Sequence, residues 1–264
     1  MKNDISQYSK ELFEDGFTHI KSLLNDSEIE LVASAIDSNI QNPSPFAKTM
    51  KSPEGGVFFM DYNNWRKLPL IEKICKLPKI VELVTSLTNS KNCWLFHDNI
   101  LVKNELAPPT PAHQDRPYYI FKGDLNLSVW ITVDDVANDS SLIFYKGSHK
   151  TNKIYTPKSF VNGLDLSENK ISFEVITSQT LENFEKTDFN MKPGDALIFF
   201  NKTIHSAHPH LSKQPRRALA IRYLLDGASL TKFYSAATPP YDKMGVKIIE
   251  DGLVPENIFP LLKN

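Results

Sequence analysis

From Cys93 onward the chain is a succession of short β-rich segments separated by clusters of proline, glycine, asparagine and aspartate. The segments read WLFHDNILV, YYIF, LNLSVWITV, LIFY, ISFEV, DALIFF and ALAIRYLL. Runs of β-branched and aromatic residues that end at turn-forming residues are typical of strands. Many short strands in succession predict a double-stranded β-helix, also called a jelly roll, over about residues 93–225.

The residues before Cys93 have a helical pattern instead. Apolar residues recur with helical spacing over residues 5–14 and again over about residues 70–87. Between them, FTHIKSLL is expected to be a short strand that enters a second helix, and Ser27 and Glu30 fit the capping box of that helix. Residues 41–56 are rich in proline, serine and glycine and are expected to form a loop. We therefore expect an α+β fold, mainly β, in which these helices brace one face of the jelly roll.

The length of 264 residues is sufficient for one domain with a sizeable core. We expect a single domain with a helical part over about residues 1–92, the jelly roll over about 93–225 and a C-terminal extension over 226–264. The extension could close the mouth of the barrel or form an oligomer contact. Residues 151–192 are mostly polar and long enough to serve as an active-site lid.

The charge and the cysteine content limit the classes of partner. A net charge of -1 and a pI near 6.7 provide no general attraction to nucleic acid or to an anionic membrane. A small-molecule substrate is therefore expected, and the oligomeric state is left open. The two cysteines form no disulfide framework, and neither an apolar leader nor a run of about 18 apolar residues occurs. These features favour the cytoplasm.

The segment TPAHQD places His113 and Asp115 two residues apart. Alternate residues of an extended segment point to the same side, so both can reach one metal ion. A third ligand, His205, follows the strand-like DALIFF. Two imidazoles and a carboxylate form the facial triad of non-haem Fe(II) oxygenases. With seven histidines and 31 acidic residues, roughly one His-x-Asp/Glu is expected by chance, so the context must support the assignment.

The segment RRALAIRYLL supplies that context. Arg216, Ala218 and Ala220 share one face of the expected strand, whereas larger apolar residues occupy the other face. A guanidinium beside small side chains suits a carboxylate held by two parallel hydrogen bonds. An iron site with such a receptor suggests 2-oxoglutarate, which chelates iron through its keto-acid end and leaves its far carboxylate for Arg216.

Three further residues could line the same cavity. In LNLSVWITV, Trp130 lies between polar residues on one face while the other face is apolar. This pattern fits a strand that lines a small polar cavity, although a half-exposed tryptophan is the alternative. Asn99 and Lys103 share one face of the strand that precedes His113. Either residue could contact the cosubstrate or the substrate, or simply lie on the surface.

Four ordered motifs resemble the phytanoyl-CoA dioxygenase family over about residues 95–225. They are KNELAPPTPAHQDRPYY, LSVWITVDD, GSHK and GDALIFFNKTIHSAHPHLSKQPRRALAIRYL. The resemblance implies a jelly-roll enzyme that uses Fe(II), 2-oxoglutarate and O2 and releases succinate and CO2. By the same resemblance, His113, Asp115 and His205 are the metal ligands, Arg216 binds the 2-oxoglutarate carboxylate and Trp130 forms a wall on the cosubstrate side.

The chain departs from the family pattern at two positions near the distal histidine. Ala207 stands where the family often has a serine, and His210 stands where it has an asparagine. The first change removes one hydroxyl contact to the cosubstrate, and the second adds a histidine to the HSAHPH cluster. His205 is still the expected ligand because it directly follows the strand and has the family spacing to Arg216.

Several alternatives remain at the level of the sequence. Asp115 occupies the position where a halogenase of this fold has a small residue, so hydroxylation is the expected reaction. Desaturation, ring closure or epimerisation would use the same ligands. A cupin-type metal enzyme that does not use 2-oxoglutarate and a jelly-roll binding module without a catalytic ion are the alternative classes. The substrate is not encoded in these motifs, and the family name does not imply activity on phytanoyl-CoA.

Overall fold

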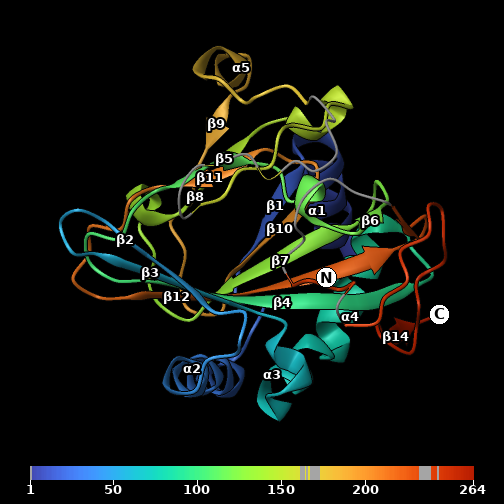
Figure 1. Ribbon diagram of the computed structural model, residues 1–264, viewed down its shortest axis with the longest axis horizontal. Coiled ribbons are helices and arrows are strands. Elements are labelled where there is room, and N and C mark those ends of the chain that lie inside the picture. The colour runs from blue at the N-terminus through green and yellow to red at the C-terminus, as the bar shows by residue number, and fades with distance from the viewer. Residues whose placement is uncertain (1, 161–163, 165, 167–172, 232–238, 243) are drawn as a thin grey trace.

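The computed structural model describes residues 2–160, 164, 166, 173–231, 239–242 and 244–264 (Figure 1). The helices of these residues are α1 (Lys2–Asp15), α2 (Asp26–Gln41), α3 (Pro69–Cys75), α4 (Pro78–Thr88) and α5 (Ser178–Glu182). Helices α2 and α3 lie on one side of a large sheet, and a smaller sheet lies on the other side (Figure 1). The molecule is therefore layered as helix, sheet and sheet.

Both sheets are antiparallel. The large sheet has the order β1 (Phe17–Ile20), β10 (Ala196–Phe200), β7 (Leu127–Thr132), β12 (Arg216–Leu225), β4 (Cys93–Lys103), β3 (Val57–Tyr62), β2 (Lys48–Lys51), with β14 (Leu261–Lys263) also paired to β4. The small sheet has the order β5 (Thr110–His113), β11 (His205–Ala207), β8 (Leu142–Tyr145), β9 (Lys186–Thr187). A separate pair joins β13 (Ser229–Leu230) to β6 (Phe121–Lys122). Two facing antiparallel sheets agree with the predicted jelly roll.

Strand β7 separates two apolar clusters, as its alternating sequence predicts. Leu127, Val129 and Ile131 are fully buried against the helices that cover the large sheet. Burial of each such side chain stabilises the fold by roughly 1.5–3 kcal/mol. Trp130 points the opposite way, into the cluster between the two sheets that also contains Ala218 and Ala220 of β12. The helices therefore stabilise the sheet from outside and leave its inner face available for a site.

The N-terminal part differs from the sequence prediction in detail. The capping box of α2 is formed by Asn25 and Glu28, because the Asn25 side chain accepts from Glu28 N and the Glu28 carboxylate accepts from Asn25 N. The predicted pair Ser27 and Glu30 was wrong by two positions. The expected helix over about residues 70–87 is divided into α3 and α4, because the residue before Pro78 avoids helical dihedral angles.

Strands also occur in segments expected to be loop or helix. Strand β1 agrees with the short strand expected in FTHIKSLL, whereas β2 lies inside the expected loop over residues 41–56 and β3 follows that loop. In the segment YYIF, Tyr118 ends a short 3-10 helix, Tyr119 and Ile120 form a bend, and only Phe121 lies in a strand. Within ISFEV, residues 171 and 172 lie outside the described part, and residues 173–175 form only an isolated bridge at Glu174.

The C-terminal extension packs against one end of the large sheet. Tyr241 and Phe259 are buried in a cluster with Phe96 of β4 and Phe121 of β6. The extension also contributes β13 and β14, which pair with β6 and β4. The described part of the extension thus lies against the end of the large sheet where β4 begins.

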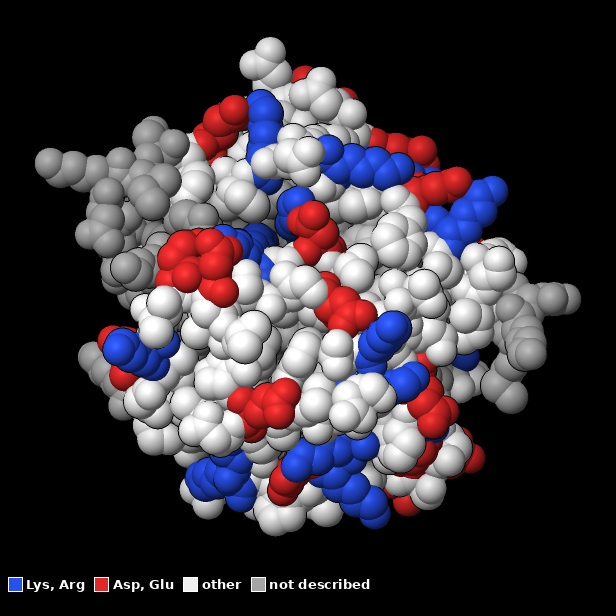
Figure 2. Space-filling model, turned by 90° about the vertical axis from the view of Figure 1, so that its right-hand side faces the viewer, with Lys and Arg blue, Asp and Glu red and all other residues white. Residues whose placement is uncertain are grey.

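The surface carries charges of both signs. On the face drawn in Figure 2, lysine and arginine side chains alternate with aspartate and glutamate side chains, as expected for a net charge of -1. None of the helices in the described ranges is long and apolar enough to span a membrane.

Candidate metal and cosubstrate site

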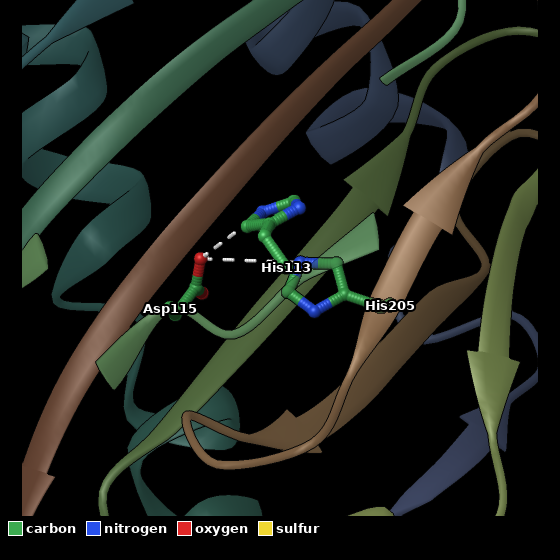
Figure 3. Close-up of side chains that lie close together, drawn as sticks. All are labelled: His113, Asp115 and His205. Atoms are coloured by element: carbon green, nitrogen blue, oxygen red, sulfur yellow. Dashed lines mark ion pairs between the residues drawn. The ribbon is translucent and has the colours of Figure 1, made fainter. Parts of the chain in front are cut away.

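The three residues predicted to bind metal converge between the two sheets. His113 ends β5 and is paired in register with His205, the first residue of β11. Asp115 follows β5, and its Oδ1 lies 3.8 Å from Nε2 of His113 and 3.9 Å from Nε2 of His205 (Figure 3). One ligand atom from each residue lies within 4.8 Å of the others. The pairing of two short strands thus brings distant parts of the sequence to one point.

Backbone carbonyls fix the orientation of both imidazoles. Nδ1 of His113 lies 2.8 Å from the oxygen of Pro111, and Nδ1 of His205 lies 3.0 Å from the oxygen of Thr203. Because a carbonyl only accepts, Nδ1 carries the proton and the lone pair of Nε2 faces inward. Burial lowers the pKa of His113 to about 3 and also lowers the pKa of His205, so both rings are neutral near pH 7. Neutral imidazoles with free Nε2 atoms fit a divalent cation.

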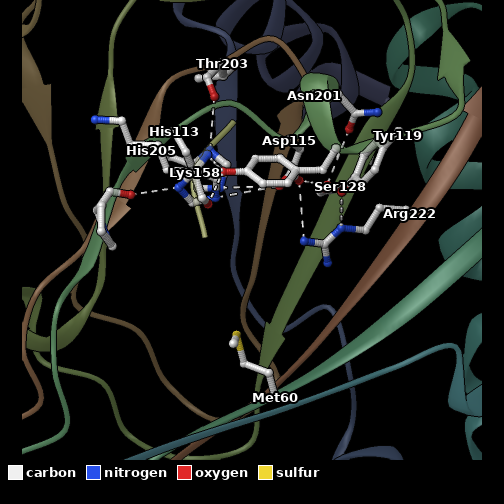
Figure 4. Close-up of polar contacts among 12 residues, drawn as sticks. Met60, His113, Asp115, Tyr119, Ser128, Lys158, Asn201, Thr203, His205 and Arg222 are labelled. Carbon is white, nitrogen blue, oxygen red and sulfur yellow. Dashed lines mark hydrogen bonds and ion pairs between the residues drawn. The ribbon is translucent and has the colours of Figure 1, made fainter. Parts of the chain in front are cut away.

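The carboxylate of Asp115 is buried but ionised. Its Oδ2 accepts a 2.9 Å hydrogen bond from Ser128 Oγ and lies 3.4 Å from Nη2 of Arg222 (Figure 4). Burial alone would raise the pKa of Asp115, but the Arg222 guanidinium holds it well below its usual range. The sequence prediction missed the role of Arg222 and Ser128. The sequence contained a signal for both residues. Arg222 falls on the same face of its strand as Arg216, and Ser128 falls on the same face as Trp130.

Arg216 provides a second buried cation. The residue is 1% exposed and lies at the start of β12, with Nη1 donating a 2.7 Å hydrogen bond to the oxygen of Ser140. Its guanidinium carbon lies 5.5 Å from the centre of the Trp130 ring, and Nε has no hydrogen-bond partner within the described residues. Burial lowers the pKa of Arg216 to about 10, so it remains cationic at neutral pH. The guanidinium therefore retains capacity for an external anion.

A cavity of about 230 Å³ joins the triad to Arg216. Trp130 and Asn99 line this cavity, as the sequence suggested. Lys103 does not line it, because its Nζ donates to the oxygen of His208 and lies 4.9 Å from the centre of the Phe58 ring. The other walls are largely apolar and include Phe58, Met60, Tyr62, Leu101, Tyr118, Tyr119, Leu142, Phe160, Leu166 and Phe199.

The first part of the expected lid is hydrogen-bonded to residues next to the triad. Gln114 donates to the oxygen of Lys153, and the Tyr118 hydroxyl donates to the oxygen of Lys158. The ring of Phe160 lies edge-on to His113, with a centroid distance of 4.6 Å. Residues 161–163, 165 and 167–172 of the expected lid lie outside the described part of the chain. The described portion places an aromatic side chain over one metal-ligand candidate.

Comparison with protein families gives a match over most of the chain. Residues 12–218 match the model of the family described as Phytanoyl-CoA dioxygenase (PhyH). A methylphosphonate hydroxylase of Gimesia maris is 28% identical over 144 residues, which are 53% of this chain and 50% of that protein. The chain thus matches about half the length of this relative.

Solved structures share the same arrangement of strands. The epimerase SnoN, solved with Fe3+, alpha ketoglutarate and nogalamycin RO, has a TM-score of 0.81 with 18% identity and 100% coverage of both chains. The alpha ketoglutarate dependent carbocyclase SnoK from nogalamycin biosynthesis has a TM-score of 0.77 with 19% identity, covering 97% of this chain and 95% of that one. These likenesses confirm the predicted double-stranded β-helix fold.

Proposed function

The chain belongs to the phytanoyl-CoA dioxygenase family, and we propose from this premise that it is an Fe(II)/2-oxoglutarate-dependent dioxygenase that hydroxylates a small molecule. Succinate and CO2 would be the coproducts. The observation that carries the proposal is the convergence of one atom each from His113, Asp115 and His205 within 4.8 Å on the wall of a cavity that also holds Arg216. Metal ligands and a buried cation in one cavity are what a chelating keto diacid requires.

His113, Asp115 and His205 would hold the iron. The two Nε2 atoms and Oδ1 of the carboxylate face one another, and the protons on Nδ1 are bound by carbonyls that keep the rings in place. When bound, Fe(II) would supply the redox chemistry that couples O2 to the oxidation of 2-oxoglutarate and substrate. The chain would contribute a rigid ligand set on one side of the metal and leave the cavity side open.

Arg216 would bind the far carboxylate of 2-oxoglutarate. Its guanidinium is cationic, and the neighbouring Ala218 and Ala220 are small enough to leave space beside it. Trp130 would form one wall of this compartment, and Asn99 would contribute a polar group on the neighbouring part of the large sheet. Lys103 would not contact the cosubstrate directly, because it lies behind the wall, where its Nζ is buried and hydrogen-bonded to the oxygen of His208 and burial lowers its pKa to about 6.

The apolar walls favour a substrate with an apolar or aromatic body, and hydroxylation is the reaction we propose. The name of the Gimesia maris relative supports hydroxylation, whereas the likeness to an epimerase and a carbocyclase keeps other outcomes of the same ligand set in view. The carboxylate of Asp115 at the third ligand position argues against halogenation. We also place the enzyme in the cytoplasm, which is supported by the two free, buried cysteines Cys75 and Cys93.

Release of labelled CO2 from 2-oxoglutarate carrying the label at C1 would test this function. Fe(II)-dependent release by the wild-type protein, lost in His113→Ala, is the expected result. A library of small metabolites would then be searched for compounds that stimulate the release. Iron binding without any CO2 release would favour a cupin-type metal enzyme that does not use 2-oxoglutarate. Absence of iron binding would favour a binding module.

A further inference from the structure

The two oxygens of Asp115 have different surroundings. Oδ1 faces Nε2 of both histidines at 3.8 and 3.9 Å. Oδ2 faces away from them, accepts from Ser128 Oγ at 2.9 Å and lies 3.4 Å from Nη2 of Arg222. In Figure 4 the carboxylate stands between the imidazoles on one side and these two partners on the other. One oxygen is thus available to a metal, and the other is occupied by the protein.

The partners of Oδ2 belong to the rigid part of the fold. Ser128 of β7 and Arg222 of β12 are cross-strand neighbours in the register of the large sheet. Both are buried, at 0% and 6% exposure. Arg222 is fixed further by Nε, which donates a 2.9 Å hydrogen bond to the Tyr119 hydroxyl. Two side chains of the large sheet therefore bind Asp115, which follows β5 of the small sheet.

The occupied oxygen limits how Asp115 can coordinate an ion. A carboxylate can bind a cation through one oxygen or through both. Bidentate binding would require the carboxylate to rotate so that Oδ2 turns away from Arg222. The guanidinium would then be buried without its carboxylate partner, which strongly lowers the stability of the protein. The pair of strands that carries Arg222 and Ser128 therefore opposes rotation of the carboxylate toward the histidines.

We propose that Arg222 and Ser128 are positioning residues that restrict Asp115 to one-oxygen coordination and so keep one coordination position of the metal free. Two imidazoles and one oxygen fill about three of six positions and leave about three, which a bidentate keto acid and O2 together require. A bidentate Asp115 would leave only about two. The inference rests on the proposed function, because it concerns the same metal ligands.

Water exchange at a substituted Mn(II) ion measures the open positions without turnover. Mn(II) prefers six oxygen and nitrogen ligands, and bound water that exchanges rapidly enhances the relaxation of solvent protons. For the wild-type protein we expect about three exchangeable waters, and for Arg222→Met about two, so the relaxivity per bound Mn(II) should fall by about one third. Ser128→Ala, which removes only the hydroxyl, should give a smaller decrease in the same direction.

Arg217→Met is the matched control. Arg217 lies on the same strand as Arg222 but on the opposite face of β12, where it binds Asp134 and Asp37. Its loss also removes an arginine ion pair from this strand, but it should leave the relaxivity unchanged. Equal relaxivity of the wild-type protein and of both Oδ2 variants, with Mn(II) bound, would overturn the proposal.

Two further outcomes also decide the question. If Arg222→Met and Ser128→Ala both lose Mn(II), the partners hold Asp115 in the site but do not set its coordination mode, and the proposal is overturned. Should Arg222→Met fail to fold, Ser128→Ala alone gives the decision. The measurement needs no 2-oxoglutarate, so a wild-type protein with about three exchangeable waters that forms no 2-oxoglutarate complex would contradict the proposed function and leave this inference intact.

Discussion

Two buried arginines on the same face of β12 differ in their charge partners. Arg216 and Arg222 both point from β12 into the cavity and are 1% and 6% exposed. Arg222 has the carboxylate of Asp115 and the hydroxyl of Tyr119 as partners. Arg216 forms no ion pair with a described carboxylate and donates to a carbonyl oxygen. The charge of Arg222 is neutralised within the chain, whereas the charge of Arg216 is left for a ligand.

The pKa values of the two side chains follow the same division. Burial would lower the pKa of Arg222, but Tyr119 and Asp115 raise it above its usual range. For Arg216, burial is the dominant influence and lowers the pKa to about 10. An enzyme gains from such an arrangement because the site holds a cation ready at the place where an anionic cosubstrate binds, at a cost in stability of the empty protein.

The largest expected effect comes from the metal ligands beside the Arg222 end. His113→Ala, Asp115→Ala and His205→Ala should each abolish Fe(II) binding, because two ligands cannot hold the ion at this site. Equilibrium dialysis with a colorimetric iron assay would measure this, and circular dichroism would show that the protein is folded. His208→Ala is the control, since His208 pairs with Asp188 away from the triad. Wild-type iron binding by any of the three variants would remove that residue from the triad.

The next largest effect is a difference between Arg222 and Arg216 in their contribution to the stability of the metal-free protein. Arg222→Met leaves the buried Asp115 without its cation and should lower the free energy of unfolding by roughly 3–5 kcal/mol. Arg216→Met removes a cation that has no partner among the described carboxylates, so it should be neutral or slightly stabilising when no ligand is present. Urea unfolding at neutral pH would compare them. Equal destabilisation by both substitutions would contradict the division.

Arg216 should matter more for the binding of 2-oxoglutarate than for the stability of the empty protein. Arg216→Ala should weaken cosubstrate binding by roughly 10–100-fold, which corresponds to about 1.5–3 kcal/mol for hydrogen bonds to a charged group. Iron affinity should change little. Calorimetric titration of the Fe(II) protein without oxygen is the measurement, with Arg217→Ala as the control. Unchanged affinity would mean that another cation of the cavity, such as Arg222, binds the carboxylate.

A pH-dependent effect is expected at Lys103, which is paired in register with Arg216. Burial lowers the pKa of Lys103 from 10.5 to about 6. Between these values the unfolded chain binds the proton and the folded chain does not, so this lysine makes stability rise with pH by at most about 1.4 kcal/mol per unit. Lys103→Met should therefore be more stable than the wild type at pH 7, with a difference that shrinks toward pH 9. A pH-independent difference in urea unfolding would show that Lys103 is charged in the folded state.

The residues of the candidate site that converge on one cavity could be selected from the sequence. The spacing of His113 and Asp115 and the small neighbours of Arg216 were visible without tertiary information, and the structure brings the three residues to one cavity. Asp115, however, lies beyond the end of β5 with αR dihedral angles and not on the expected extended segment. Asn99 and Lys103 share a strand face, yet only Asn99 lines the cavity. The sequence could not show that Phe58 and the His208 carbonyl cover Lys103.

The fold was predictable where strands are long and apolar. Strand β8 matches LIFY, and the two faces of β7 follow its alternating pattern. Strands β5 and β11, which carry the two histidines, contain four and three residues and lack an apolar run. Their pairing depends on the contacts between distant segments. The pairing of Arg222 was missed for a similar reason, because its partner Asp115 lies in the segment that follows β5, far from β12 in the sequence.

Anaerobic absorption spectroscopy of the Fe(II) protein with 2-oxoglutarate tests the central claim most directly. Chelation of iron by the keto-acid end gives a weak visible charge-transfer band that neither component produces alone. The site of His113, Asp115, His205 and Arg216 predicts that the band appears in the wild-type protein and requires more 2-oxoglutarate in Arg216→Ala. Iron binding without the band at saturating 2-oxoglutarate would contradict the account and favour a metal enzyme that does not use this cosubstrate.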